Sequence, residues 1–444
     1  MTTTSFRDVY DDITSAATRV EIAQKSGVLV FAFGVWSLRA IAVVGMLLLM
    51  VGAFGRWQRT KTRLMQSGSG IIAMALAGYI VISAIAFALI FDEHAKDMLG
   101  EGMRLIYLCG FVFFALALAD NRNYLWPAIA LSIIGFFVTR AIYLPDLIAT
   151  SDAWWTARHA LGFPTAIPMG QSAFAVLLGL IIFAPRILNL NRNPIIILWV
   201  VAIVLSIQFV TISQTRSVWL SAPVFLIATI SLMVIDKGVE ARALKWIFVA
   251  LTASTVMVAA LQYSTIEARL TTESETWSQL AEGEISAIPS TREGGQVKSI
   301  GIRVNMLEFG IEKWLERPVF GWGPGATKML IECCAPESFQ RFNDLHSAYP
   351  EILLRLGLVG ALLMLFLNIS LARDAIGATR RGELPRDILL FVALCVALHW
   401  VVAIANFRLL NYDWRFYWIF FAGIAMAFSL RDSTPRDTQR SPEA

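Results

Sequence analysis

Residues 27–54, GVLVFAFGVWSLRAIAVVGMLLLMVGAF, decide the fold class of this chain. An apolar run of about 20 residues crosses a hydrocarbon core of roughly 30 Å as a helix. This run is longer, so it forms either one long tilted helix or two short helices that turn near Ser37, Leu38 and Arg39. An arginine is costly at mid-membrane but reaches the interface from a hairpin tip, which favours two helices.

The rest of the chain repeats this pattern. Of its 444 residues, 57% are hydrophobic and 16% charged, against about 25% charged in ordinary soluble domains. The mean hydropathy is +0.63. Together with residues 27–54, the apolar runs predict an all-α polytopic membrane protein with about twelve transmembrane helices, or eleven if the first run is one helix. The other runs are residues 69–91, 103–119, 124–141, 170–185, 194–212, 217–235, 246–262, 347–371, 388–405 and 414–430.

Positive charge is concentrated in alternate connections between these runs. By the positive-inside rule the basic connections are cytoplasmic. The connection 92–102, on the other side, is acidic. The net charge of +4 and the pI of 8.9 therefore follow from topology, and no nucleic-acid partner is expected. The basic connections are residues 55–68, 119–123, 185–193, 236–245, 372–387 and 431–444.

This orientation puts the one long hydrophilic segment, residues 263–345, and a second loop, residues 142–169, outside the cytoplasm. We expect four parts: an N-terminal transmembrane region (1–262), a periplasmic cap (263–345), a C-terminal transmembrane region (346–430) and a cytoplasmic tail (431–444). Within the cap, residues 300–316 read as a helix that ends before Pro318 and a glycine-rich turn. At 100° per residue Arg303 falls in the middle of the apolar side of this helix, with Leu307, Gly310 and Trp314.

The cysteines form no framework. Cys109 and Cys395 lie inside apolar runs, whereas Cys333 and Cys334 are adjacent in the polar cap. A disulfide that involves this pair and two free thiols are equally compatible with the sequence.

Motifs of other enzyme classes are missing. The stretch GWGPGATK, 321–328, resembles a phosphate loop but lacks its G-K-[ST] ending, and we expect a turn. The sequence contains no H-E-x-x-H, paired C-x-x-C, external D-x-D or G-x-S-x-G motif. We therefore predict neither a metal nor a cofactor.

Three side chains in unusual places carry the functional prediction. Arg216 lies in a short external turn between two spans, Arg303 lies on the cap helix, and His346 lies at the entrance of a span. Each has an ordinary interpretation: a lipid anchor, a neutralised or snorkelling arginine, and a contribution to the helix cap with Asp344 or Ser347.

Together the three side chains suit a glycosyl-transfer site. Two guanidinium groups can bind a diphosphate, because their planar fork matches phosphate oxygens. A neighbouring imidazole, kept neutral by the two cations, can take a proton from an attacking hydroxyl. Other charged residues could hold a sugar or lipid phosphates, but a structural role is favoured for them. They are Arg140, Arg158, His159, Arg408 and Asp413.

These features resemble the bacterial O-antigen ligases and the broader O-antigen ligase/polymerase family. The resemblance rests on the helix that carries Arg303 and Trp314, on the turn RPVFGWGPG, on His346 in LHSAYPEILLRLGLVG, and on Arg216 upstream. It implies a GT-C-like membrane glycosyltransferase without metal or nucleotide, whose donor is a glycan on undecaprenyl diphosphate. Ligases transfer O-antigen to lipid A-core at the periplasmic face of the inner membrane.

The resemblance also implies roles for the three residues. Arg216 and Arg303 would bind the donor diphosphate, and His346 would activate the acceptor hydroxyl for an inverting displacement. The chain departs from the family at Ser347, where asparagine is common, and at Arg355, in a stretch that often carries an acidic residue.

Three other functions stay open beside ligase. An O-antigen polymerase or a protein O-oligosaccharyltransferase would use a similar donor and the same base. A lipid-linked-sugar transporter would instead favour charges along a central pathway and an internal repeat. Here the notable charges gather at one face, and no repeat is apparent. The sequence makes no prediction of oligomeric state.

Overall fold

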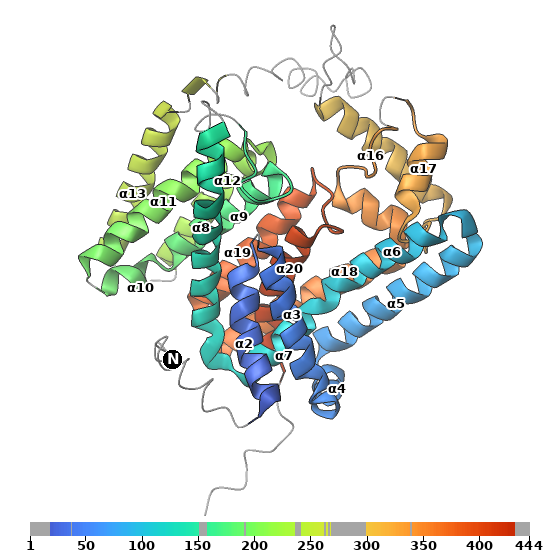
Figure 1. The fold of residues 1–444 in the computed structure, drawn as a ribbon, viewed down its shortest axis with the longest axis horizontal. Helices are drawn as coiled ribbons and strands as arrows, with labels where there is room; N and C mark the ends of the chain where they lie inside the picture. Colours follow the sequence, from blue (N-terminus) through green and yellow to red (C-terminus); the bar gives the residue numbers. More distant parts are fainter. Residues whose placement is uncertain are drawn as a thin grey trace, which may run out of the picture.

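The computed structural model describes residues 18–36, 38–150, 158–190, 192–235, 241–261, 263–264, 267, 299–337 and 340–430. Most of residues 263–298 of the predicted cap (263–345) and the predicted tail 431–444 lie outside these residues. The described part contains helices and no strands (Figure 1). The α-helices are α2 (Arg19–Gly34), α3 (Arg39–Phe54), α4 (Trp57–Gln66), α5 (Gly68–Ile90), α6 (Ala95–Ile106), α7 (Phe111–Asp120), α8 (Leu125–Thr150), α9 (Ala166–Ile182), α10 (Ala184–Asn189), α11 (Asn193–Ser213), α12 (Arg216–Ile235), α13 (Ala241–Leu261), α16 (Ser299–Glu316), α17 (Ala326–Cys334), α18 (Ala348–Arg380), α19 (Arg386–Ala403) and α20 (Tyr412–Ala427). Short 3₁₀ helices are η1 (Asp92–His94), η2 (Tyr107–Gly110) and η3 (Arg122–Tyr124).

The first apolar run folds as two helices, as predicted. α2 and α3 are 16 residues each, and the chain turns between them next to Arg39. The two helices pack closely because glycines face the partner backbone: a Cβ on Gly45 would lie 2.3 Å from the Phe31 amide nitrogen. The Arg39 guanidinium is exposed and lies 5.0 Å from the centre of the Tyr412 ring. The arginine thus stays at the hairpin tip.

The polytopic membrane class is confirmed, and each of the twelve predicted apolar runs corresponds to a helix of the described chain. Seven helical segments of the described chain are long and apolar enough to cross a membrane, or eight if α3 and α4, bent by 92°, form one span. Five of the twelve predicted runs form helices outside the seven: α2, α3, α9, α13 and α20. α9 and α20 have only 17 and 16 residues because they are interior helices, buried on nearly all sides.

Four of the six connections predicted to be cytoplasmic meet at one end of the bundle, here called the basic end; they are the described parts of residues 55–68, 119–123, 185–193 and 372–387. Asp120 accepts from Arg63 at 2.7 Å and lies 3.4 Å from Arg59, which ties α4 to the end of α7. The α18–α19 connection joins this end through Arg122 and Glu383, 3.6 Å apart. The charges in these loops therefore pair with one another across the end of the bundle.

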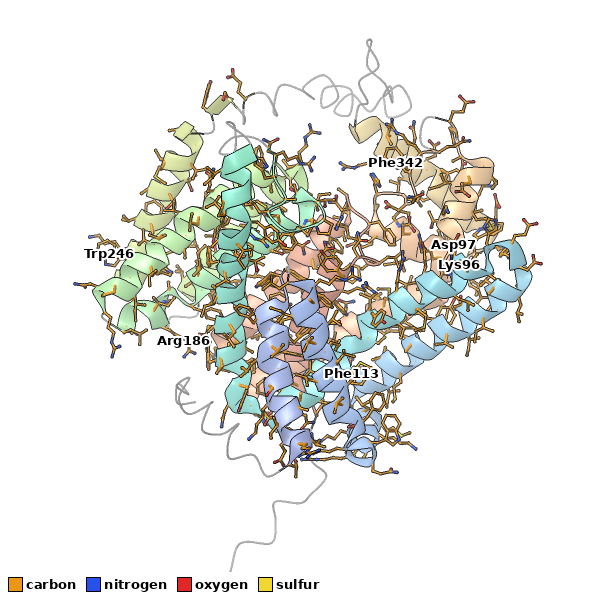
Figure 2. All side chains as sticks on the ribbon, viewed as in Figure 1. Lys96, Asp97, Phe113, Arg186, Trp246 and Phe342 are labelled. Carbon is orange, nitrogen blue, oxygen red and sulfur yellow. A yellow bond between two sulfur atoms is a disulfide. The ribbon has the colours of Figure 1, made fainter. Side chains whose placement is uncertain are left out.

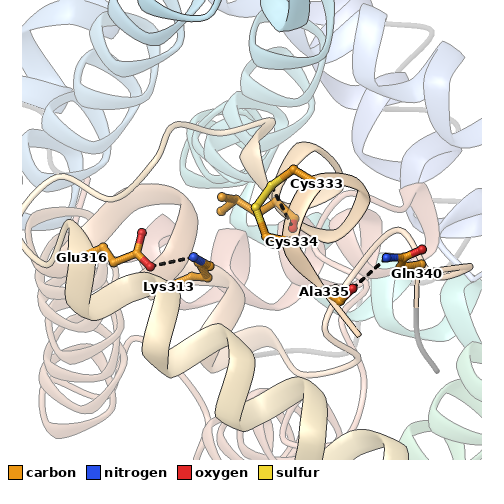
Figure 3. The surroundings of a disulfide bond; sticks show 7 residues. Lys313, Glu316, Cys333, Cys334, Ala335 and Gln340 are labelled. Carbon is orange, nitrogen blue, oxygen red and sulfur yellow. Dashed lines mark hydrogen bonds and ion pairs between the residues drawn. A yellow bond between two sulfur atoms is a disulfide. The ribbon is translucent and has the colours of Figure 1, made fainter. Parts of the chain in front are cut away.

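The cap helices α16 and α17 lie at the opposite end (Figure 1). Their own small apolar core contains Met306, Phe309, Leu330, Leu345 and Leu354. α16 matches the helix predicted for 300–316. At the end of α17, Cys333 and Cys334 are bonded to each other as a disulfide, and Figure 3 shows its surroundings.

Candidate active site

His346 lies in a loop just before α18 and is held by Asp344. The His346 amide donates to Asp344 Oδ1 at 2.8 Å, and Nδ1 of its ring lies 2.6 Å from the same oxygen. The backbone φ of His346 is 53°, a left-handed conformation that these two bonds stabilise. About a third of each side chain is exposed, 34% for His346 and 30% for Asp344. The ring therefore has one nitrogen fixed and the other available to a substrate.

The sequence placed Asp344 and Ser347 as possible caps of α18, and the structure assigns them differently. Ser347 occupies the N-cap position, but its side chain makes no cap hydrogen bond. Asp344 bonds to the histidine instead. The spacing Asp-Leu-His was visible in the sequence as a signal for this pair.

A buried carboxylate, that of Glu351, also anchors the loop that carries His346. Glu351, in the first turn of α18, accepts from the Leu345 amide at 2.7 Å and from the Thr327 hydroxyl at 2.7 Å. The guanidinium of Arg355 bonds to both Glu351 and Glu101, and no part of Glu351 is exposed. The loop that carries His346 is thus tied to α17, α18 and α6. Sequence analysis missed this network, although an i, i+4 Glu–Arg pair is a recognisable signal.

α18 is broken at Gly357, which has φ 62° and ψ −168°. A break in an apolar helix leaves backbone groups without partners, and these must be satisfied by other protein groups. Here the turn 317–325 supplies them. The amides of Trp322 and Gly323 donate to the carbonyls of Leu354 and Arg355 at 2.8 and 3.0 Å.

On the far side of the break, the amides of Leu358 and Val359 donate to Pro318 and Val319 at 2.9 and 3.1 Å. The stretch GWGPG therefore forms a turn, as predicted, and this turn makes backbone hydrogen bonds to the break in α18. It positions the half-helix 348–356 and with it the His346 loop.

Arg303 lies on α16, beside the His346 loop. The buried face of α16 carries Ile302, Met306 and Phe309, so Arg303 lies at the edge of this face and not in its middle. A Cβ on Gly310 would lie 2.4 Å from Leu345, which shows how closely α16 approaches the loop. The three apolar residues share a core with Leu345 and with Phe342.

Phe342 connects this core to the histidine, because its ring centre is 4.9 Å from that of His346. Arg303 and His346 are both half-buried and flank the same small core. They belong to one region of the cap.

Arg216 begins α12 directly after a tight turn. Gln214 takes a left-handed conformation there (φ 48°), and the Thr215 hydroxyl lies 3.3 Å from the Ala166 carbonyl. Arg158 Nε donates to the Ser213 carbonyl at 3.3 Å. The turn is therefore fixed against α9 and the 158–165 segment, and a second arginine lies near Arg216.

The end of α19 links the Arg216 turn to the His346 loop. Asn406 donates to the Ser217 hydroxyl at 3.2 Å, and the Tyr349 hydroxyl donates to the Trp400 carbonyl at 3.1 Å. The first turns of α12 and α18 thus contact the same stretch from two sides. Within the described residues, no hydrogen bond or ion pair joins His346 to either arginine. The Arg216 turn and the His346 loop are therefore linked through residues 400–406, and Arg303 approaches the His346 loop from α16.

The secondary candidates divide into two groups. Arg408 and Asp413 form a buried two-pronged ion pair at 3.0 and 3.1 Å, and Arg140 is buried with its guanidinium 4.3 Å from the Phe163 ring centre. These three are structural. His159 and Arg158 instead lie beside the Arg216 turn, since the His159 amide donates to the Ile212 carbonyl at 3.2 Å.

No group of three or more His, Cys, Asp or Glu side chains within the described ranges is arranged to hold a metal ion. The carboxylates nearest His346 are already engaged by protein donors: Glu351 by a backbone amide, and Asp344 by the histidine. Metal independence stays a prediction from the sequence.

Comparison with protein families identifies this region. Residues 201–365 match the family model described as O-antigen ligase. Residues 201–365 are therefore similar to an O-antigen ligase domain. The matched segment includes Arg216, Arg303 and His346, and it runs through the break at Gly357. A search of curated proteins finds no match.

The domain indicates membrane glycosyl transfer of the O-antigen ligase or polymerase type, with a lipid-linked glycan as substrate. The arrangement around it is consistent with that chemistry. A histidine with an anchored ring and two arginines lie on three elements that meet at one end of the bundle.

Proposed function

We propose that the chain is an O-antigen ligase that transfers O-antigen polysaccharide from undecaprenyl diphosphate to lipid A-core. The observation that carries this proposal is the Asp344–His346 pair inside the O-antigen ligase domain. Its Nδ1 proton is assigned from the hydrogen bond to Asp344, which leaves Nε2 as the acceptor. The site would face the periplasm of the bacterial inner membrane.

In this mechanism Nε2 of His346 takes the proton of the acceptor sugar hydroxyl. The hydroxyl oxygen attacks the anomeric carbon of the donor, and the bond from that carbon to the diphosphate oxygen breaks. The new glycosidic bond has inverted configuration, and undecaprenyl diphosphate leaves with the bonding electrons. The proton then passes from the imidazolium to solvent or to the departing diphosphate.

Arg216 and Arg303 would neutralise charge that develops on the leaving diphosphate. Guanidinium groups suit this role because they remain charged and bind phosphate oxygens in pairs. Interactions that strengthen as charge develops lower the barrier more than interactions equal in both states. Loss of either arginine should therefore reduce kcat as well as donor affinity.

A transfer assay tests the base assignment. Purified protein is reconstituted with lipid-linked glycan and lipid A-core, and the product is separated by gel. We expect His346→Gln to retain donor binding and to lose roughly 10²–10⁴-fold in transfer rate, the usual contribution of a general base. The matched control is His94→Gln, at a histidine of η1 outside the site. Equal rates for the two variants would remove His346 from the mechanism.

A second assay identifies the acceptor. In cells that lack the protein, ligase function predicts long glycan retained on its carrier beside bare core lipopolysaccharide. Single repeat units on the carrier would indicate a polymerase instead, and glycoprotein loss with normal lipopolysaccharide would indicate protein glycosylation. Movement of donor between leaflets without a new glycosidic bond would indicate transport.

A further inference from the structure

A cavity of about 610 Å³ lies at the basic end, on the side of the molecule away from the His346 loop. It is bounded by the ends of α9, α12 and α18 and the beginnings of α10 and α19. Figure 2 shows Arg186, which lines it, far from Phe342 of the candidate active site. The cavity has no part in the proposed transfer reaction.

The polar lining of this cavity is predominantly cationic. The described lining residues include three arginines, Arg186, Arg380 and Arg386, and one carboxylate, Asp387, which together carry a net charge of +2. Arg186 is fixed in place, because it binds both oxygens of Asp387 at 2.5 and 3.1 Å and its guanidinium lies 4.3 Å from the centre of the Trp126 ring. The Arg186 guanidinium is therefore held in one position at the rim of the cavity.

Arg380 differs from Arg186 because its side chain is exposed and makes no ion pair or hydrogen bond among the described residues. The arginines near Asp120, at the same end of the bundle, bind that carboxylate instead. A guanidinium at the membrane surface that has no protein carboxylate suits a phosphate group.

Most of the remaining lining of the cavity is apolar, and part of it faces outward. Leu232 of α12 and Ile376 of α18 are 43% and 42% exposed, and both lie within about two turns of the helix ends. A free phosphate ion gains nothing from such walls. A phospholipid places its phosphate among the arginines and its acyl chains along the two helices.

We infer that this cavity binds a phospholipid with an anionic headgroup. The ligand class follows from the combination of a +2 rim, an orienting ion pair and exposed aliphatic walls at the depth of a helix end. Basic pockets between transmembrane helices are a known form of lipid recognition. The site is separate from the candidate active site and does not depend on the function proposed for it.

The test uses full-length protein in nanodiscs that contain phosphatidylcholine with either phosphatidylglycerol or cardiolipin. After transfer to mild detergent, lipids that remain bound are counted by native mass spectrometry. The variant is Arg380→Gln with Arg386→Gln. Its control is Arg192→Gln with Arg373→Gln, which removes the same charge from exposed arginines outside the cavity.

We expect the cavity variant to retain roughly 30-fold less anionic lipid, from about 1 kcal/mol per arginine near a membrane surface, and the control to match the unmodified protein. Leu232→Trp, which fills the apolar wall, should also reduce retention. Equal loss in cavity and control variants, or equal retention of phosphatidylcholine, would overturn the proposal. Displacement of the lipid by millimolar inorganic phosphate would show a free-anion site instead.

Discussion

The buried group formed by Glu101, Arg355 and Glu351 makes an asymmetric prediction about stability. One guanidinium serves two carboxylates, and Glu351 is fully buried while the Arg355 side chain is 2% exposed. Arg355→Met would leave Glu351 without its cation in a dry site, and loss of one partner of a buried pair costs about 3–5 kcal/mol. Glu351→Gln instead leaves a neutral Arg355–Glu101 pair.

Glu351→Gln also keeps an oxygen that can accept from the Leu345 amide, so its cost should be about 1–2 kcal/mol, the scale of one weakened hydrogen bond. The double variant, Arg355→Met with Glu351→Gln, should be more stable than Arg355→Met alone, because it removes the stranded charge. A coupling of this sign is expected only for residues in direct contact.

Unfolding of the purified protein by SDS in mixed micelles, followed by tryptophan fluorescence, gives the four free energies. Arg373→Met, at an exposed arginine later in α18, is the control and should lie within about 0.5 kcal/mol of the unmodified protein. The reasoning is refuted if Arg355→Met proves no more costly than Glu351→Gln, or if the double variant is less stable than both single variants.

Four further measurements test individual features of the structure. Asp344→Asn should slow transfer about 10–100-fold at unchanged donor KM, because a neutral amide stabilises the imidazolium less and can donate to Nδ1, which favours the wrong tautomer. An unchanged kcat would contradict this. Gly357→Ala puts a Cβ 2.3 Å from the Val319 carbonyl oxygen, at a backbone φ of 62°. It should lower the free energy of unfolding in SDS by at least about 2 kcal/mol. The control Gly78→Ala, where a Cβ on α5 meets open space, should cost nothing. Thiol labelling of the folded protein should rise by two groups after mild reduction, since the disulfide of α17 is exposed; no rise would mean free thiols. Burial lowers the pKa of His159 below its ordinary 6.5. The unfolded state therefore binds a proton at a higher pH than the folded state does, and the free energy of unfolding should fall as the pH drops below 6.5. His159→Gln should remove this pH dependence when unfolding is measured from pH 7.5 to 5.

The sequence predicted those parts of the fold that depend on the free-energy cost of placing an individual residue, whatever its distant neighbours are. Arg39 decides between one helix and two, because a cation is expensive at mid-membrane wherever the neighbouring helices lie. The cap helix and the turn after it follow from periodicity and from Pro318. The lengths of α9 and α20 were less predictable, because a helix enclosed by others need not match the thickness of the membrane.

Positions that depend on partners distant in the chain could not be predicted in this way. Arg303 was placed on the apolar face by helical periodicity, yet the face that is buried is centred on Ile302 and Phe309. The difference arises because Leu330, Leu345 and Leu354 form a core with Ile302, Met306 and Phe309 of α16. Periodicity shows how residues group around a helix, but the neighbouring loop determines which group is covered.

The break in α18 shows why the placement of His346 needed the structure. Residues 347–371 read as one apolar span, and a lone glycine inside such a run is normally tolerated. The break at Gly357, with φ 62°, is stabilised because the turn that begins at Pro318 donates to the carbonyls of Leu354 and Arg355 and accepts from the next two amides after the break. The half-helix that follows His346 is therefore held by protein hydrogen bonds as well as by apolar burial. The orientation of this half-helix depends on residues 318–323, which lie more than thirty residues before the break at Gly357.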